Sequence, residues 1–317
     1  MADTVLRVIA DDGSFRVVAA LTTDTVKAVA EAQRVQGVTA SLLGELLTGT
    51  ILIRETMAPQ LRVQGILKSG SAKGGSLVAD SHPDGTARGL VSGLTFGETN
   101  RMQGAVLQMM RTLHNGALHQ GIVEFRGGNI SSALMEYLLN SEQVASTVAV
   151  AALLDHDRIA VAGGYLVQLL PEAKPDALAA MTNRIARLTS IESLLSVGKA
   201  SPSELADALL AGIPFTRLEE KPLRFGCRCS KERLLATLAT LDAREIQEIV
   251  AEGKPVDITC DYCNLAYVLT VEELRSLLNG ASLGAGTALV FGNTFDTLLI
   301  PLNVAAVAVL FADALLN

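Results

Sequence analysis

The sequence predicts an α+β protein with a mostly antiparallel N-terminal sheet, then a helical linker and a small C-terminal zinc domain that contains every cysteine. Strand-like stretches come before and between a few helical stretches in the first half, which is the element order of an α+β fold. Apolar residues then recur at helical spacing. All four cysteines of the 317-residue chain fall in one short window near its C-terminal end.

The composition is that of a globular protein with an aliphatic core. Hydrophobic residues make up 49% and charged residues 19% of the chain, while tryptophan is absent. The net charge of −7 argues against nucleic acid as the main partner, because phosphate binding needs clustered Lys and Arg. No signal peptide follows Met1, and cysteines without a signal fit a reducing compartment. We therefore expect a cytoplasmic protein.

The first half of the chain alternates between strand and helix patterns. A β-hairpin is expected from Leu6 to Ala20, around the turn formed by Asp11, Asp12 and Gly13. Further strands are expected at 62–67, 76–80, 148–154 and 160–170. Helices are expected from Thr23 or Asp24 to Gln33, from Thr39 to Glu55 and from Leu134 to Leu139.

The glycine-rich joint and the histidines could suggest phosphate binding and catalysis, respectively, but neither pattern has the residues that these functions need. The glycine-rich joint at 69–75 lacks the G-K-[ST] order of a phosphate-binding loop, so we expect a hairpin loop there. The histidines lie in or near predicted turns without metal-ligand spacing, and we expect them to be solvated and not catalytic. They are His82, His114, His119 and His156. The sequence thus predicts a protein that is not an enzyme.

A boundary between Pro171 and Pro175 separates residues 1–174, an α+β core domain, from a helical linker at 175–225. Apolar residues from Leu178 to Leu195 recur at steps of three and four and predict one amphipathic helix.

A second linker helix begins at a capping box. Ser201 and Glu204 form the box and Pro202 takes the first helical position, so this helix should run to Ala211 and stop at Gly212. The apolar faces of both helices must rest on another surface.

The cysteines form a C-x-C pair and a C-x-x-C pair separated by thirty residues: Cys227, Cys229, Cys260 and Cys263. Two such pairs supply two edges of a tetrahedral four-cysteine zinc site. Four separately buried cysteines would have no reason to occur at these spacings. Two static disulfides are the other alternative, but a C-x-C disulfide closes a small strained ring, which suits a switch better than a permanent link. We predict one Zn²⁺ per chain, bound by four thiolates in the reduced state.

The residues around these cysteines resemble a known family. C-R-C-S-K-E-R followed by C-D-Y-C resembles the redox switch of the redox-regulated heat-shock chaperones, the 33 kDa chaperonin family. The resemblance extends upstream through Y-L-L-N-S-E-Q at 137–143 and G-G-Y-L-V-Q-L-L-P at 163–171, and covers about residues 5–278. One departure is Asn264-Leu265, where a glycine-containing turn is expected; it bears on the turn geometry but leaves all four ligands in place.

The resemblance implies an ATP-independent holdase that is inactive when reduced and zinc-bound. Oxidation would form the disulfides Cys227–Cys229 and Cys260–Cys263, which are also the near neighbours in sequence, and would release zinc. The unsupported linker helices would then expose apolar faces to unfolded client proteins. The resemblance also implies that a homodimer accompanies activation.

The zinc-binding domain is assigned to residues 226–280, with helices expected at 231–240, 242–253 and 270–280. A module this small needs zinc for much of its folding free energy, on the order of 10 kcal/mol in comparable sites. The apolar tail, 281–317, lies outside the resemblance. Its longest uncharged run, Thr297 to Ala312, is sixteen residues and contains a proline, so we expect a packed or partner-binding tail and not a membrane span.

Two other functions use similar cysteines. A zinc-ribbon nucleic-acid-binding protein would share the four-cysteine geometry, but residues 226–263 contain five Lys/Arg against seven Asp/Glu. A thiol–disulfide oxidoreductase would use the C-x-x-C pair, but that motif normally opens a helix in a thioredoxin-like pattern. Here the pair lies between two strand-like segments.

Overall fold

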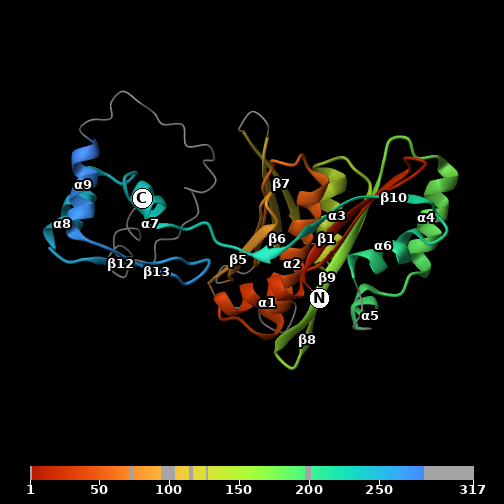
Figure 1. Ribbon diagram of the computed structural model, residues 1–317, viewed down its shortest axis with the longest axis horizontal. Coiled ribbons are helices and arrows are strands. Elements are labelled where there is room, and N and C mark those ends of the chain that lie inside the picture. Colours follow the sequence, from red (N-terminus) through yellow and green to blue (C-terminus); the bar gives the residue numbers. More distant parts are fainter. Residues whose placement is uncertain are drawn as a thin grey trace. The chain divides into compact units, whose positions relative to one another are not determined.

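The protein is described by a computed structural model that covers residues 2–70, 74–93, 104–113, 117–125, 128–196 and 201–281. The chain divides into two compact units, Met1–Gly226 and Cys227–Asn317. Figure 1 labels the helices and most of the strands of both units. The tail predicted at 281–317 lies, after its first residue, outside the described residues.

The first unit contains a five-stranded antiparallel sheet with strand order β10-β1-β2-β9-β8. The predicted hairpin is confirmed as β1 and β2, and its turn uses Gly13 at a φ of +72°, a conformation that glycine adopts without strain. The strands are β1 (Thr4–Ala10), β2 (Phe15–Leu21), β8 (Ser146–Asp155), β9 (Arg158–Leu169) and β10 (Phe215–Pro222).

A second sheet in this unit has six strands in the order β11-β5-β4-β3-β6-β7. All its pairs are antiparallel except β11 with β5. The predicted pairing of the strands on either side of the glycine-rich joint is confirmed. The strands are β3 (Val63–Lys68), β4 (Ser76–Ser81), β5 (Thr86–Ser92), β6 (Val106–Thr112), β7 (Leu118–Glu124) and β11 (Arg224–Phe225).

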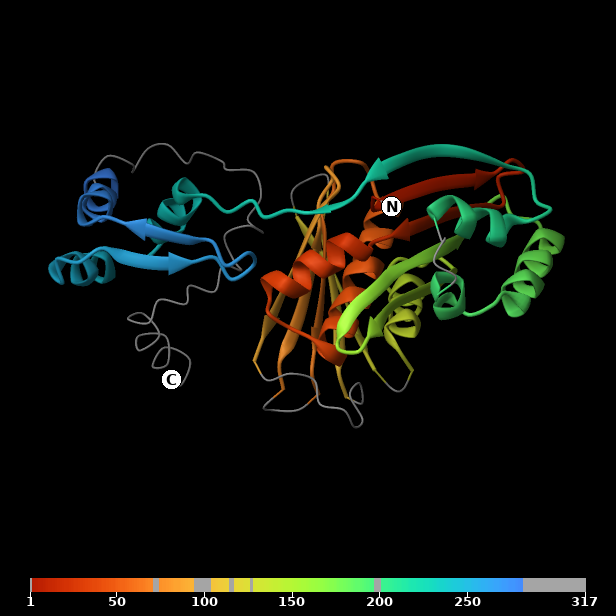
Figure 2. The same ribbon diagram turned by 60° about the horizontal axis from the view of Figure 1, so that its bottom comes forward.

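Helix α2 (Gly37–Thr56) packs against strands of both sheets and forms the centre of the main hydrophobic core, with α1 (Thr23–Ala32) and α3 (Ile130–Asn140) beside it (Figure 2). Close approach depends on glycine: a Cβ at Gly65 would lie 2.6 Å from Thr50 Oγ1, and one at Gly89 would lie 2.8 Å from Val29. By length and composition α2 could cross a membrane, but 72% of its apolar window is buried inside the unit. It is a core helix.

The opposite face of the five-stranded sheet carries α4 (Pro175–Arg187), α5 (Ile191–Ser196) and α6 (Pro202–Leu210). Because side chains alternate along a strand, Val18 contributes to the core around α2 whereas its neighbour Val17 contributes to this second cluster. The capping box of α6 is confirmed: the Ser201 side chain accepts from the Glu204 amide at 3.2 Å.

The prediction of a single helix from Leu178 to Leu195 is wrong. The chain leaves the helical conformation at Leu188, where φ is −69° and ψ is 138°, and a new helix starts at Ile191. Met181 and Leu195 are both buried in one cluster, as the apolar pattern predicts.

The expected helical linker, 175–225, contains strands as well as helices. After α6 the chain forms β10, which pairs with β1, and then β11, which pairs with β5. This segment therefore belongs to both sheets of the first unit. The domain boundaries as such stay predictions.

The prediction that the histidines are solvated is wrong for two of them. His82 is 2% exposed and its Nε2 lies 3.2 Å from a carboxylate oxygen of Asp80, which Arg62 and Arg88 also contact. His82 therefore lies in a buried polar cluster and not in a solvated turn. His119 lies half-buried in β7, whereas His156 occupies an exposed turn as expected. His114 lies outside the described residues.

The second unit is small and has its own hydrophobic cluster, built on Leu234, Ile258 and Leu274. The three predicted helices are confirmed, and Ser230, Asp242 and Thr270 cap them. Its elements are α7 (Lys231–Leu238), α8 (Ala243–Ala251), β12 (Val256–Thr259), β13 (Ala266–Leu269) and α9 (Val271–Ala281).

Candidate metal centre

The Sγ atoms of all four cysteines lie within 4.8 Å of one another. Cys227 lies 3.7 Å from Cys260 and Cys229 lies 3.4 Å from Cys263, measured between Sγ atoms. Tetrahedral Zn–S bonds of about 2.3 Å would place neighbouring sulfurs about 3.8 Å apart. The donor set and its spacing therefore fit a tetrahedral zinc ion.

The first cysteine pair lies between β11 and the start of α7. Ser230, directly after Cys229, ends this loop because its hydroxyl accepts from the Arg233 amide at 3.3 Å and caps the helix. The ion pair between Lys231 and Glu273, at 2.7 Å, then joins the first turn of α7 to α9. The helix start fixes where the loop ends, so the second ligand has little freedom to move away.

The second cysteine pair occupies the tight turn between β12 and β13. The Cys260 amide donates to the Leu265 carbonyl at 2.9 Å, and the Asn264 amide donates to the Cys260 carbonyl at 2.7 Å. Asn264 has a φ of +57°, in the left-handed region that glycine and asparagine tolerate best. Asparagine thus performs the role expected of glycine, and the departure noted in the sequence leaves the turn intact.

A hydroxyl outside the ligand set contacts the centre. Tyr267, on β13, donates a hydrogen bond from its hydroxyl to Cys229 Sγ at 3.2 Å. Such bonds from outer residues orient metal ligands and adjust their basicity. The sequence did not single out Tyr267, although its position four residues after Cys263, at the start of the returning strand, is a usable signal.

The pKa shifts of the clustered thiols favour a bound cation at this centre. A hydrogen bond with Cys227, together with burial, raises the pKa of the Cys260 thiol above its ordinary value. Burial raises the pKa of Cys263 to about 12. Thiols gathered in this way resist ionisation because each thiolate would repel the next, whereas a bound divalent cation compensates that charge. The arrangement is suited to metal binding and not to an isolated reactive thiolate.

The structure brings together all four cysteines that the sequence predicted as ligands. Among the residues it describes, no second group of three or more His, Cys, Asp or Glu side chains is arranged to hold a metal ion. Asp80 and His82 are close to each other, but arginines already compensate that carboxylate.

The fold and this centre define a two-unit α+β protein with a C-terminal four-cysteine module. The family model described as "Hsp33 protein" matches residues 3–270, nearly the whole described chain. The chain belongs to the Hsp33 family of chaperones.

Relatives named "33 kDa chaperonin" support this assignment. The chain is 33% identical over 289 residues to the one from Syntrophotalea carbinolica, covering 88% of this chain and 100% of the relative. It is 32% identical over 296 residues to that of Synechococcus elongatus, covering 88% and 98%. The crystal structure of the Hsp33 homologue from Thermotoga maritima aligns with a TM-score of 0.76 over 89% of this chain and 99% of that chain. At 23% identity this last similarity shows the fold.

Proposed function

We propose that this protein is a redox-regulated, ATP-independent holdase that is inactive with zinc bound and active after oxidation. The observation that supports it most directly is the cluster of four sulfurs within 4.8 Å in a family of chaperones. Cys227, Cys229, Cys260 and Cys263 hold one Zn²⁺ in the reduced state. The ion contributes folding free energy to the module, because a unit of this size rarely gains more than about 3–5 kcal/mol from its hydrophobic core.

Oxidation removes the ligands. Each disulfide forms when two thiolates give up two electrons to peroxide, which takes up two protons and leaves as two water molecules after a sulfenic acid intermediate. We assign the disulfides to Cys227–Cys229 and Cys260–Cys263. Links within each pair leave the two halves of the module unconnected, so the module can unfold. Links across the halves would hold it together.

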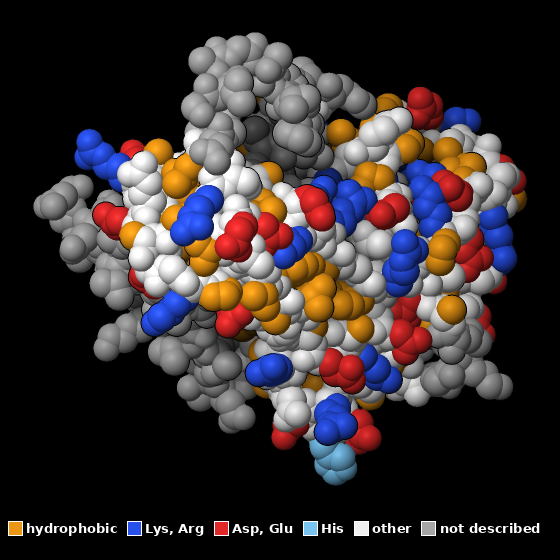
Figure 3. Space-filling model, turned by 60° about the vertical axis from the view of Figure 1, so that its left-hand side comes forward, with side chains coloured by type: hydrophobic (Ala, Val, Ile, Leu, Met, Phe, Trp, Pro, Cys, Tyr) orange, Lys and Arg blue, Asp and Glu red, His pale blue; other side chains and the backbone are white. Residues whose placement is uncertain are grey.

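Unfolding of the module would uncover apolar surface for clients. Helices α4, α5 and α6 bury residues such as Met181, Leu195 and Leu209 on the five-stranded sheet. In the described part of the chain, the exposed large hydrophobic side chains are spread over different elements, among them Ile122, Leu139 and Leu178. On the face shown in Figure 3, hydrophobic side chains are interspersed with charged ones of both signs. Release of the helices therefore supplies the larger apolar surface that unfolded polypeptides bind.

The remaining parts of the proposal follow from the family and the chemistry. The partners are unfolding proteins, and activation is accompanied by homodimer formation. A reducing compartment, the cytoplasm, keeps the thiols available to zinc. The role is binding and not catalysis. The turn position of Cys260 and Cys263 between two strands disfavours a thiol–disulfide oxidoreductase, whose C-x-x-C pair opens a helix.

The test follows zinc release and chaperone activity in one sample. Reduced, zinc-loaded protein is treated with peroxide while a chromogenic chelator reports zinc and light scattering reports aggregation of unfolding citrate synthase. We expect about one zinc per chain to be released as aggregation is suppressed. Equal suppression by the reduced, zinc-loaded protein would refute the proposal. Zinc release without any suppression would leave a purely structural metal module.

A further inference from the structure

Strand β10 covers one edge of β1 but contributes little apolar packing. The ladder runs from Thr4 opposite Pro222 to Ala10 opposite Phe215, while the other edge of β1 pairs with β2. Figure 2 shows β10 along the outside of this sheet. Residues 216–220 are all exposed. What β10 supplies to the fold is mainly main-chain hydrogen bonding.

The ladder between these strands is irregular. The register shifts between Arg7 and Val8, so that Leu218 has no residue opposite it and is 53% exposed. A bulge of this kind interrupts the hydrogen bonds of the ladder. The β10–β1 pairing is therefore weaker than that of a regular strand of equal length.

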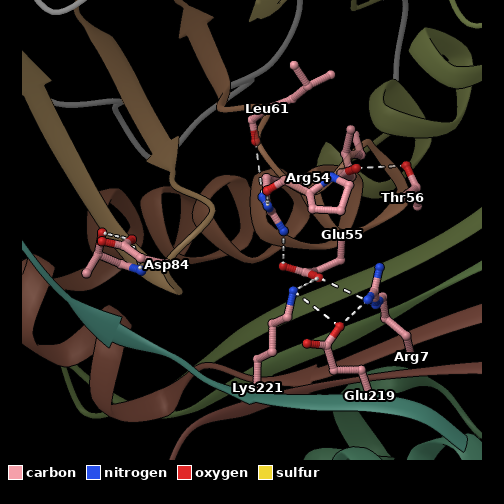
Figure 4. A network of polar contacts seen from close by, with 11 residues as sticks. Arg7, Arg54, Glu55, Thr56, Leu61, Asp84, Glu219 and Lys221 are labelled. Atoms are coloured by element: carbon pink, nitrogen blue, oxygen red, sulfur yellow. Dashed lines mark hydrogen bonds and ion pairs between the residues drawn. The ribbon is translucent and has the colours of Figure 1, made fainter.

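The side-chain contacts between β10 and the rest of the first unit shown in Figure 4 are ion pairs and not apolar packing. Glu55 of α2 is 2% exposed and accepts from Arg54 at 2.6 Å. Its second oxygen lies 3.8 Å from Arg7 Nε and 3.9 Å from Lys221 Nζ. Glu219 of β10 pairs with Arg7 and lies 3.3 Å from Lys221.

This network can be released at small cost. When β10 leaves, Glu219 and Lys221 gain water, while Glu55 keeps Arg54 and Arg7 as partners. The ion pair of Arg217 on β10 with Asp207 is exposed at both ends, and exposed pairs add little stability. A strand held by such contacts can separate without exposing an apolar core of its own.

The edge beneath β10 would suit an unfolded chain. Leu6, Val8 and Ala10 of β1 point into the cluster that α6 covers. Without β10 and α6, β1 would present unpaired main-chain groups next to an apolar face. Such an edge binds extended peptides by strand addition, in which main-chain hydrogen bonds supply affinity with little dependence on sequence.

Chain connectivity links this strand to the metal centre. Pro222 and Cys227 are separated by four residues. The amides of Leu223, Arg224 and Gly226 donate to the carbonyls of Asp3, Gly85 and Ala87, respectively, so this stretch is ordered up to the first ligand. If the chain after Gly226 unfolds, Gly226 becomes the border with disordered chain, and local separation starts at such ends. The three amide hydrogen bonds of Leu223, Arg224 and Gly226 must open before β10 can separate.

We propose that β10 is a removable cover, and that the uncovered edge of β1 binds an extended segment of unfolded polypeptide as an added antiparallel strand. Release of β10 on oxidation rests on the proposed function. The binding edge itself is a separate claim, because a holdase could bind clients through helix faces alone. Strand addition explains how one site accepts many sequences.

Hydrogen exchange of the full chain, read by mass spectrometry, tests the claim in three states: reduced and zinc-loaded, oxidised, and oxidised with unfolding citrate synthase. We expect oxidation to increase exchange in β1 and β10, and client to restore protection to β1 but not to β10. Strand β8, the other edge of the same sheet, is the control and should not change with client. The inference would be overturned if the oxidised protein held the client while the amides of β1 exchanged as fast as they do without client. An oxidised chain that holds no client contradicts the proposed function itself, and the inference falls with it.

A charge variant separates release of β10 from loss of zinc. Lys221→Glu places an anion facing Glu55, whereas Arg217→Glu makes the same charge change on the same strand beside the exposed Asp207. In the reduced protein, Lys221→Glu should speed exchange in β10 and tighten client binding several-fold with zinc retained, and Arg217→Glu should do so much less. Faster exchange in β10 without tighter client binding would contradict the inference, as would equal effects of the two variants.

Discussion

The hydroxyl of Tyr267 donates a hydrogen bond to Sγ of Cys229 at 3.2 Å, which joins the returning strand of the second unit to the first cysteine pair. The two residues come from opposite sides of the thirty-residue spacer. The bond therefore orients Cys229, a proposed zinc ligand, across the module.

Loss of this bond should weaken zinc binding. We expect Tyr267→Phe to lower zinc affinity about tenfold, because the ring remains but the donor to the thiolate is gone. Competition with a chromogenic chelator under reducing conditions measures the change. Val268→Ala, at an exposed position on the same strand, is the matched control and should keep the original affinity. An affinity of Tyr267→Phe equal to that of the control would show that the bond does not tune the centre.

The left-handed conformation of Asn264 should restrict substitution there. A β-branched residue at this φ costs about 1–2 kcal/mol, so Asn264→Val should destabilise the zinc-loaded second unit by that amount. Asn264→Gly should be close to neutral. Denaturant unfolding of the reduced protein, followed by zinc release, measures both. If valine were tolerated as well as glycine, the left-handed turn after Cys263 would be wrong.

Removal of the metal should unfold the second unit and spare the core of the first around α2. In reducing buffer with a strong chelator, we expect residues 227–281 to become protease-sensitive, since the small cluster around Ile258 cannot hold the module alone. The core of the first unit around α2 should survive as a protected fragment because it is independent of the cysteines. Limited proteolysis with mass spectrometry reads this out. A module that stays resistant without zinc would contradict the prediction.

The pH dependence of stability should have a component from Glu45. Burial, with a smaller contribution from Glu192, raises the pKa of this carboxyl to about 7. The folded state therefore binds the proton more tightly than the unfolded state, so stability from this group is present at low pH and is lost as pH rises through about 7.

Glu45→Gln should remove that loss. We expect it to raise the free energy of unfolding by about 1–2 kcal/mol at about pH 8 and to change it little at about pH 5. Denaturant titrations at both values, with Glu31→Gln on α1 as a surface control, measure the effect. A variant equally stabilised at both values would show that charge at Glu45 is not the cause.

Local patterns in the sequence predicted most of the elements that depend on neighbouring residues. The hairpin around Gly13, the capping boxes at Ser201 and Asp242 and the pairs of cysteines each act over a few residues, so their physics is visible in the chain. The grouping of the four cysteines belongs here too, because their C-x-C and C-x-x-C spacing already suits two edges of a tetrahedral site.

Tertiary structure alone decided features that depend on distant partners. Strand β10 reads F-T-R-L-E-E-K-P, with no apolar alternation, and becomes a strand because β1 offers an edge and Glu55 offers a charge. His82 is buried beside Asp80, whose charge two arginines from other strands or loops already compensate. Tyr267 reaches Cys229 only after the spacer has folded. In each case the stabilising free energy comes from a contact between residues that are far apart in the sequence. The cysteine spacing is different, because it indicates a metal site from neighbouring residues alone.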